Sequence, residues 1–299
     1  MIHGIINVYK EKGFTSHDVV AKLRGIVGQK KIGHTGTLDP DATGVLPVCL
    51  GKATKLCDLL TDKNKTYEAV LLLGKTTDTQ DITGEVLEEK STEALTEEKV
   101  REAIEGFIGD YEQIPPMYSA LKVNGKKLYE LAREGKVIER KARPVKILDI
   151  QILEIDLPKV RMEVSCSKGT YIRTLCHDIG EKLGCGGCME SLIRTRVSTF
   201  RIEDAKMLDE IETLKQEGKL AELLVPIDAM FPSYPKITVK DDWKAFAKNG
   251  NPLDLKMLKE ACGQDEETQV RLYDESGQFI AIYQWKEKKY HIVKMFFNE

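Results

Sequence analysis

The sequence contains no apolar run that approaches the roughly 20 residues that a helix needs to cross a bilayer. Its first residues, 1–4, also lack the charged and apolar pattern of a secretion signal. Internal repeats and low-complexity linkers are absent as well. These absences argue against a membrane protein and indicate a cytoplasmic one. With 299 residues, 41% of them hydrophobic, the chain can bury one large core and one small core, so we expect two domains.

Cysteine is sparse, and its count of seven is odd. Most of these cysteines lie in apolar runs, which favours reduced, buried thiols. Cys185 and Cys188 have the spacing of half a zinc site or of a redox pair, and Cys176-His177 lies just upstream. The second pair that a zinc site would need is missing. We therefore predict no metal site, and metal or disulfide chemistry at Cys185 and Cys188 stays open as a minor alternative.

The most distinctive segment of the chain runs from Gly33 to Pro47 and reads GHTGTLDPDATGVLP. It places three glycines and two prolines around Asp39 and Asp41, which fixes the backbone near these two acids. Pro40 keeps Asp39 out of the helical region, so the carboxylate should lie on an ordered loop. An ordinary turn is one interpretation, because these residue types are common in turns.

Three functional interpretations compete for this loop. A phosphate cradle would need a Lys-Ser or Lys-Thr directly after the glycines, and the loop has none. An aspartyl-phosphate pair made by Asp39 and Asp41 would need an apolar strand that delivers the first acid, and residues 34–37 do not form one. Metal-assisted phosphoryl chemistry remains a minority interpretation. A single catalytic carboxylate would need a cationic partner to stay ionised.

Arg173 is the candidate for that partner. Residues 160–166 alternate apolar and polar as in a half-buried strand, and residues 172–183 carry apolar residues at helical spacing up to Gly184. Arg173 falls in the first turn of this helix, where a cation is unfavourable unless an anion lies nearby. An arginine on a helix is usually just solvated. The neighbouring Lys168-Gly169 turn strengthens the functional interpretation.

Five motifs occur in the order seen in the TruB family, the bacterial synthases that make pseudouridine at position 55 of tRNA. The resemblance covers nearly the whole chain and rests on Gly36-Thr37-Leu38-Asp39-Pro40-x-Ala42-Thr43-Gly44, Lys65-Thr66-Tyr67, Thr77-Asp78-Thr79-x-Asp81, Met117-Tyr118-Ser119-Ala120-Leu121-Lys122 and Ser167-Lys168-Gly169-Thr170-Tyr171-Ile172-Arg173.

The resemblance implies three catalytic residues. Asp39 matches the essential aspartate, Tyr67 the tyrosine that packs on the target base, and Arg173 the arginine that pairs with the aspartate. Without the family, Tyr67 would be interpreted as an ordinary strand aromatic.

The resemblance also implies five substrate-binding residues. His34 matches a histidine that meets the RNA where the target nucleotide leaves its stack, and Leu192 matches a leucine that abuts the uracil. Asp78 and Tyr171 match further cleft residues, and Lys168 belongs to the turn that precedes the catalytic arginine. By themselves, His34 would be a turn residue and Leu192 a core residue.

The implied reaction breaks the bond from C1′ to N1 of uridine, rotates the uracil and rejoins it through C5. It involves no redox change and no energy input, so no cofactor is expected. Whether Asp39 acts as nucleophile or base stays open. We expect Arg173 to lower the pKa of Asp39, as a nearby opposite charge does. The implied partner is the T stem-loop of tRNA, whose target uridine must be extruded. No obligate protein partner is expected, and the protein should be a monomer.

The chain departs from the family pattern at two positions. Glu11 follows Lys10 where the family usually has proline, which loosens a turn without touching a catalytic role. Ile193 replaces a common arginine, so one phosphate contact could be lost.

Charge is unevenly distributed along the chain. The formal net charge of -3 would argue against nucleic-acid binding if it were spread evenly. Residues 122–146, however, hold nine cations and three acids, and residues 19–38 hold four cations and no acid. Such runs are often solvated faces. The segment 122–146 resembles the family's flexible thumb, and we interpret it as a surface that follows RNA phosphates.

The coarse pattern predicts an α+β fold. Ser16 should cap a helix that ends at Gly28, and Thr96 should cap a second helix. Residues 65–73 and 85–87 should be strands. The resemblance specifies a pseudouridine synthase catalytic fold over residues 1–232, with a mixed, largely antiparallel sheet flanked by helices.

Residues 233–299 resemble the small, mostly β PUA-like RNA-binding domain of the family. Pro232 and Pro235 mark its boundary. Residues 241–248 read as a short helix, and 270–273, 279–284 and 290–297 read as strands. A structural cap is the alternative interpretation of this segment.

A non-catalytic RNA-binding or chaperone-like protein is the main rival to the enzyme. Such a protein would keep the basic segment and the C-terminal domain but would tolerate loss of Asp39, Tyr67 or Arg173. All three are present, which favours the enzyme.

Overall fold

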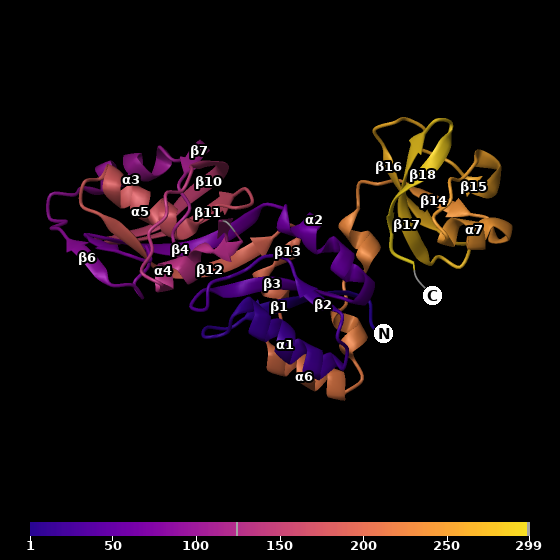
Figure 1. Cartoon of the computed structure of the whole chain (residues 1–299), viewed down its shortest axis with the longest axis horizontal. Helices are drawn as coiled ribbons and strands as arrows, with labels where there is room; N and C mark the ends of the chain where they lie inside the picture. The colour runs from indigo at the N-terminus through magenta and orange to yellow at the C-terminus, as the bar shows by residue number, and fades with distance from the viewer. Residues whose placement is uncertain (124, 298–299) are drawn as a thin grey trace.

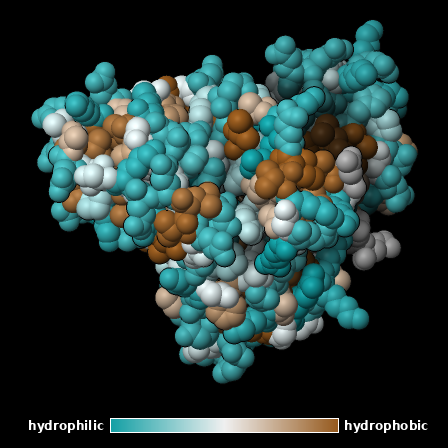
Figure 2. Space-filling view, turned by 60° about the vertical axis from the view of Figure 1, so that its left-hand side comes forward, coloured by the Kyte–Doolittle hydropathy of each residue, from teal (hydrophilic) through white to brown (hydrophobic). Residues whose placement is uncertain are grey.

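The computed structural model describes residues 1–123 and 125–297. Residue 124, inside the predicted thumb, and residues 298–299, at the end of the predicted PUA-like domain, lie outside the described residues. Among the described helices, none is both long and apolar enough to cross a membrane. The space-filling view shows a mostly hydrophilic face on which apolar side chains form separate patches (Figure 2).

A nine-stranded mixed sheet forms the centre of the fold, with its main path in the order β1-β3-β12-β4-β11-β10-β7. β2 pairs with β3, and β13 pairs with β12. All pairings are antiparallel except that between β12 and β3. The strands are β1 (Gly4–Lys10), β2 (Ile32–His34), β3 (Thr43–Leu50), β4 (Lys65–Leu73), β7 (Gly109–Gln113), β10 (Arg143–Asp156), β11 (Lys159–Cys166), β12 (Gly187–Val197) and β13 (Phe200–Arg201).

Helices cover the sheet at both of its ends (Figure 1). At one end Val100 of α3 and Leu175 of α5 join a core with β4 and β11, and at the other Leu23 of α1 and Ile211 of α6 pack on β1 and β3. Burying a side chain such as Leu23 stabilises the fold by about 1.5–3 kcal/mol. The helices are α1 (Ser16–Val27), α2 (Cys57–Thr61), α3 (Glu97–Glu105), α4 (Leu128–Arg133), α5 (Ile172–Lys182) and α6 (Leu208–Gln216).

Two small hairpins and several 3₁₀ helices complete the structure of residues 1–232. The hairpins are β5 (Lys75–Thr77) with β6 (Val86–Glu89), and β8 (Lys122–Val123) with β9 (Lys126–Lys127). The 3₁₀ helices are η1 (Gly51–Leu56), η2 (Ile202–Asp204), η3 (Leu220–Leu223) and η4 (Ile227–Met230).

The C-terminal β domain contains a five-stranded sheet in the order β15-β14-β16-β17-β18. Its Ile282 and Phe296 share a core with Ile5 and Val45 of the large sheet, so the two parts pack directly against each other. The elements are β14 (Lys236–Val239), η5 (Asp241–Trp243), α7 (Lys244–Lys248), η6 (Leu255–Met257), β15 (Leu258–Glu260), β16 (Gln269–Tyr273), β17 (Phe279–Lys286) and β18 (Lys289–Met295).

Most of the predicted elements are present. The strand at residues 65–73 matches β4, the helix capped by Thr96 is α3, and Gly28 ends α1 in the left-handed conformation at φ 72°. The predicted cap Ser16 was wrong. Thr15 caps α1 in a capping box with Asp18, because Ser16 turns inward and is buried.

Candidate active site

The Asp39 loop, residues 35–42, is held by backbone and side-chain contacts on both sides. The buried Ser16 hydroxyl accepts a hydrogen bond from the Leu38 N–H at 2.9 Å, and the Ala42 N–H donates to the Asp39 carbonyl at 3.1 Å. Gly44 follows with φ 104°, and a Cβ there would lie 2.3 Å from the Arg194 carbonyl oxygen in the adjacent strand. Glycine is therefore required where β3 approaches β12.

Lys10, at the end of β1, binds backbone carbonyls of this loop. Its side chain is fully buried and donates to the carbonyls of Ala42 at 2.6 Å and Pro40 at 3.0 Å. Burial lowers the pKa of Lys10 to about 8, although Asp39 and Asp41 oppose the shift. A buried ammonium group thus fixes the backbone on the C-terminal side of Asp39.

Arg173 and Asp39 form the ion pair that the sequence predicts. Arg173 Nε lies 3.0 Å from Asp39 Oδ2, and Nη2 lies 3.3 Å from Oδ1, so the contact is bidentate. The arginine side chain is 6% exposed and the aspartate side chain 42% exposed. The carboxylate is therefore held by a buried cation while it remains accessible from outside.

Arg173 lowers the pKa of Asp39 as predicted, but the net shift of the Asp39 pKa is upward. Burial raises the pKa of Asp39 above its ordinary value of 3.8, and this effect outweighs the guanidinium of Arg173, which lowers it. Asp81 adds to the increase because it brings a second negative charge close by. Sequence cannot reveal how much solvent a folded loop displaces.

Arg173 is also bound by groups from two other segments. Its Nη1 lies 3.6 Å from Asp81 Oδ2 and donates to the Thr79 carbonyl at 3.1 Å. Its Nη2 donates to the Tyr118 carbonyl at 2.8 Å. These contacts fix the direction from which the guanidinium meets Asp39, and they explain why a cation is tolerated in the first turn of α5.

Tyr67 lies on β4 between Val164 and Arg194 of the flanking strands. It is buried in the same core as Leu192 and Leu38, so the structure brings two predicted site residues together beside the residue that precedes Asp39. Burial raises the pKa of Tyr67, and the charge of the neighbouring, buried Arg194 opposes this increase. Arg194 also donates to the Val45 carbonyl of β3 at 2.7 Å.

His34 ends β2 and lies just before the Asp39 loop. Its Nδ1 accepts from the Gly36 N–H at 3.3 Å, and its ring meets His17 edge-on at 5.2 Å. Burial lowers the pKa of His34, so the imidazole is held in its neutral form near pH 7.

Asp78 and Tyr171 lie around the arginine without contacting Asp39 directly. Asp78 accepts from the Tyr118 hydroxyl at 3.2 Å and from the Glu85 N–H at 2.8 Å. The Tyr171 backbone exchanges two hydrogen bonds with the Gln113 side chain, which fixes the residues just before Arg173.

Lys168 points away from this centre. Its ammonium group pairs with Asp62 at 2.9 Å, just after α2. The structure therefore does not bring Lys168 together with the Asp39–Arg173 pair, and its predicted role on the substrate is left without a contact to the centre.

The comparisons with known proteins agree with one another. Residues 24–172 match the TruB family pseudouridylate synthase N-terminal domain, and residues 173–232 match the tRNA pseudouridylate synthase B C-terminal domain. A tRNA pseudouridine synthase B from Lachnoclostridium phytofermentans is 58% identical over 99% of this chain and 100% of the relative. One from Bacillus pumilus is 44% identical over 98% of this chain and 96% of the relative.

The chain belongs to the TruB family of pseudouridylate synthases. Solved structures agree: a chain in an H/ACA RNP bound to a substrate RNA containing 2′-deoxyuridine superposes with a TM-score of 0.72 at 26% identity, covering 99% of this chain and 85% of that one. A chain in a Cbf5-Nop10-Gar1 complex gives a TM-score of 0.72 at 29% identity, with 98% and 85% coverage.

Four residues of this TruB-family site escaped the sequence-based assignment. Asp81 lies in one of the five family motifs but was given no role. Lys10 and Arg194 lie next to Glu11 and Ile193, the two departures from the family pattern, and were given no role of their own. Tyr118 contributes through its backbone carbonyl, for which sequence carries no signal. A charged residue inside an apolar strand, as at Lys10 and Arg194, is the signal that could have identified two of them.

The thumb, residues 122–146, has a small core of its own. Leu128 and Leu131 of α4 pack with Met117, and Lys127 and Arg133 lie over the Tyr129 ring at 5.2 and 5.4 Å. Most of its cations are exposed. The segment thus presents positive charge from a small, local scaffold.

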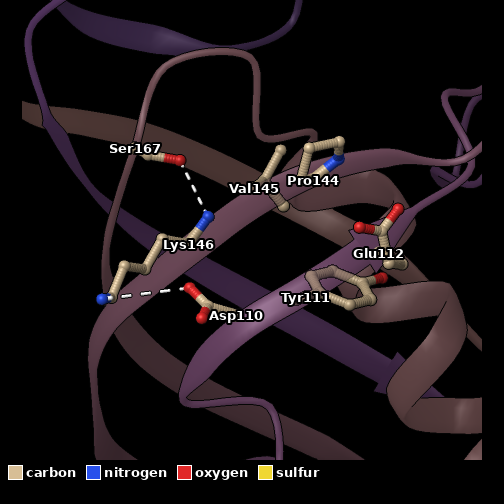
Figure 3. Close-up of a pocket in the computed structure, with 7 residues that line it drawn as sticks. All are labelled: Asp110, Tyr111, Glu112, Pro144, Val145, Lys146 and Ser167. Carbon is tan, nitrogen blue, oxygen red and sulfur yellow. Dashed lines mark hydrogen bonds and ion pairs between the residues drawn. The ribbon is translucent and has the colours of Figure 1, made fainter.

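Two further features lie outside the centre. Cys185 and Cys188 are buried free thiols, and among the described residues no group of three potential ligands is placed to hold a metal ion. A cavity of about 290 Å³ opens at the edge formed by β7 and β10, where the Lys146 N–H donates to the Ser167 hydroxyl at 2.8 Å (Figure 3). None of the predicted site residues lines it.

Proposed function

We propose that this enzyme converts the T-loop uridine at position 55 of tRNA to pseudouridine, with Asp39 as its catalytic carboxylate. The bidentate contact between Asp39 and the buried Arg173 is the observation that carries the proposal. It places one accessible carboxylate on a fixed loop beside a buried cation, as a reaction at a sugar carbon requires. Relatives that match nearly the whole chain are named tRNA pseudouridine synthase B, which supports tRNA as the substrate.

The reaction is an isomerisation whose atoms balance without a co-reactant. The C1′–N1 bond breaks, the uracil turns, and a C1′–C5 bond forms. C5 then loses its proton, and N1 gains one. Asp39 acts either as nucleophile at the sugar or as base, and in both roles it must be ionised. Arg173 favours the ionised form, since it opposes the pKa increase that burial causes.

Tyr67 and Leu192 are proposed to hold the uracil during its rotation. Both are buried next to Leu38, directly before Asp39, so an extruded base that meets the carboxylate would lie on this apolar surface. His34, neutral near pH 7, is proposed to contact the RNA where the nucleotide leaves its stack. Asp78, Tyr171 and Lys168 are proposed to act on the substrate from the rim.

The RNA is proposed to be held by the thumb and by residues 233–299 as a PUA-like domain, with residues 1–232 as the catalytic domain. Exposed cations on the thumb fit the phosphates of a stem-loop. We propose further that the enzyme acts without a cofactor, because the reaction needs neither an electron acceptor nor an energy source. It would work as a monomer in the cytoplasm, without an obligate protein partner.

Tritium release tests the proposal. An unmodified tRNA transcript labelled at C5 of uracil is incubated in chelator with the wild type and with Asp39→Asn, and a transcript with cytidine in place of the T-loop uridine serves as the matched RNA control. We expect release only from the T-loop uridine and only with the wild type. Since burial raises the pKa of Asp39, the ionised carboxylate costs stability near neutral pH, so the neutral amide should leave the fold intact. Release by Asp39→Asn at the wild-type rate, or from the cytidine control, would refute it.

A further inference from the structure

A cluster of five lysines lies where the large sheet meets the C-terminal β domain. Three come from residues 1–232 and two from the C-terminal domain, and each lies close enough to Lys52 or Lys55 for its charge to affect the pKa of that lysine: Lys31, Lys52, Lys55, Lys248 and Lys294. Lys52 and Lys248 share one aromatic ring, with their ammonium groups 4.8 and 3.6 Å from the centre of the Phe297 ring. The Lys55 ammonium donates to the Met295 carbonyl at 2.7 Å. We call these five residues the junction lysines.

The junction lysines carry their charge without acidic partners. Among residues 1–123 and 125–297, no carboxylate lies within 4.0 Å of any of these ammonium groups, whereas many other lysines in the chain are paired. Burial and the neighbouring ammonium groups lower the pKa values of Lys52 and Lys55. Five like charges in such a place repel one another, and a bound polyanion would relieve this repulsion.

The cluster is connected to the active site by two elements. β3 begins directly after the Asp39 loop and leads to η1, which carries Lys52 and Lys55. The eight residues of β3 span about 25 Å at roughly 3.3 Å per residue. Along another route, α2 follows η1 and ends beside Asp62, the partner of Lys168. Figure 1 shows α2 on the side of the sheet that faces the C-terminal domain.

We infer that the junction lysines bind the sugar-phosphate backbone of the tRNA outside the T stem-loop. A hairpin whose loop reaches Asp39 is short, and a site about 25 Å away along β3 is suited to a part of the RNA beyond it. Lysines without acidic partners recognise phosphates through charge and not sequence, so this surface adds affinity and orientation without base specificity. Lys52 from residues 1–232 and Lys248 from the C-terminal domain both contact the Phe297 ring, and these cation–π contacts keep the two lysines close together.

This inference rests on the proposed function, since it takes tRNA as the substrate, and one experiment separates the two. The double variant Lys52→Gln/Lys248→Gln is compared with the wild type for binding by fluorescence anisotropy and for single-turnover pseudouridine formation. Each protein is tested with full-length unmodified tRNA and with the isolated T stem-loop. Wild-type turnover of the stem-loop tests the proposed function, and the ratio of variant to wild type on the two RNAs tests the inference.

Two control variants are matched to the test. Lys52→Arg/Lys248→Arg keeps both charges and the contact with Phe297, and it should bind both RNAs as the wild type does. Lys99→Gln/Lys215→Gln removes the same charge from exposed lysines on α3 and α6, away from the junction. It should change neither affinity by more than about twofold, because screening confines such charges to their surroundings.

The glutamine variant should bind full-length tRNA about tenfold more weakly and show a salt dependence reduced by roughly two phosphate contacts. Its affinity for the stem-loop and its rate at saturation should be unchanged. Equal loss on both RNAs, no loss on either, or the same loss in the distant control would each overturn the inference. If wild type turns over neither RNA but the tenfold difference in binding remains, the proposed function fails while the phosphate-binding surface stands.

Discussion

The candidate active site and the thumb differ in how their charged residues are held. At the centre, Arg173 is buried and receives partners from the Asp39 loop, the β5–β6 connection and the segment around Tyr118. In the thumb, cations are exposed, and contacts such as Lys126 and Lys136 with Glu134 are local. The difference indicates that the proposed chemistry depends on long-range preorganisation, whereas the proposed RNA binding by the thumb depends on adjustable charge.

Loss of Arg173 should give the largest effect on the reaction rate. Arg173→Ala removes both bonds to Asp39 and leaves Asp81 beside it without the shared cation. We expect the single-turnover rate at saturating tRNA to fall by about 10³-fold, while affinity changes little. Rapid-quench measurement of pseudouridine and anisotropy of the same sample check this. A loss confined to affinity would erase the contrast with the thumb.

Substitution of Lys10 tests whether turnover requires a fixed Asp39 loop. Lys10→Met removes the buried donor to the Ala42 carbonyl, while the Pro40 carbonyl keeps the Gly13 N–H at 2.9 Å, so the substitution should cost about 1–3 kcal/mol of unfolding free energy and reduce turnover. Urea unfolding and single-turnover rates measure both. Lys12→Met is the matched control, because the Lys12 side chain is 73% exposed and its ion pair with Asp41 is long, at 3.9 Å. Equal effects of the two substitutions would contradict the account.

The wild-type stability should also show the ionisation of Lys10. Because the pKa in the folded state is lowered to about 8, the unfolded state binds more protons between about pH 8 and 10.5. The contribution of this residue to stability therefore rises with pH across that window. The difference in unfolding free energy between wild type and Lys10→Met should grow over the same range, and a difference that shrinks would argue against a lowered pKa of Lys10.

The thumb should show the opposite pattern to Arg173. Arg133→Gln/Lys141→Gln removes two exposed cations that have no ion pair among the described residues. We expect about tenfold weaker binding to both tRNA and the T stem-loop, with an unchanged rate at saturation. Lys99→Gln/Lys215→Gln removes the same charge elsewhere and controls for net charge. An altered saturating rate would show that the thumb takes part in the chemistry.

Much of the local structure could be predicted from the sequence. The alternating pattern of residues 65–73 specifies β4, and Gly28 specifies the end of α1, because both signals are local. The residues made Arg173 the candidate partner of Asp39, 134 residues away, and the resemblance decided in favour of this pair. The Asp39 pKa and the parallel pairing of β12 with β3 could not be predicted, because they depend on what the fold places around each group.

The helix cap predicted at Ser16 was wrong by one residue, and Ser16 has a different role in the structure. Thr15 and Ser16 are both competent caps, and only the packing of α1 against the Asp39 loop decides that Ser16 turns inward. Ser16→Ala should cost about 1 kcal/mol by removing the acceptor of the Leu38 N–H, with at most a few-fold loss of rate. Thermal unfolding checks the first value. Thr15→Ala, which removes the true cap, should cost a similar amount without any effect on rate.

The pH dependence of kcat/KM in the wild type and in Arg173→Gln tests the central claim, that Arg173 controls the charge of Asp39. At low substrate this parameter reports the free enzyme. The wild-type rate should rise with pH through a midpoint above 3.8, because burial raises the pKa of Asp39. In Arg173→Gln the midpoint should move to still higher pH, since the opposing cation is gone. Profiles that superimpose after scaling, or a shift to lower pH, would contradict the account.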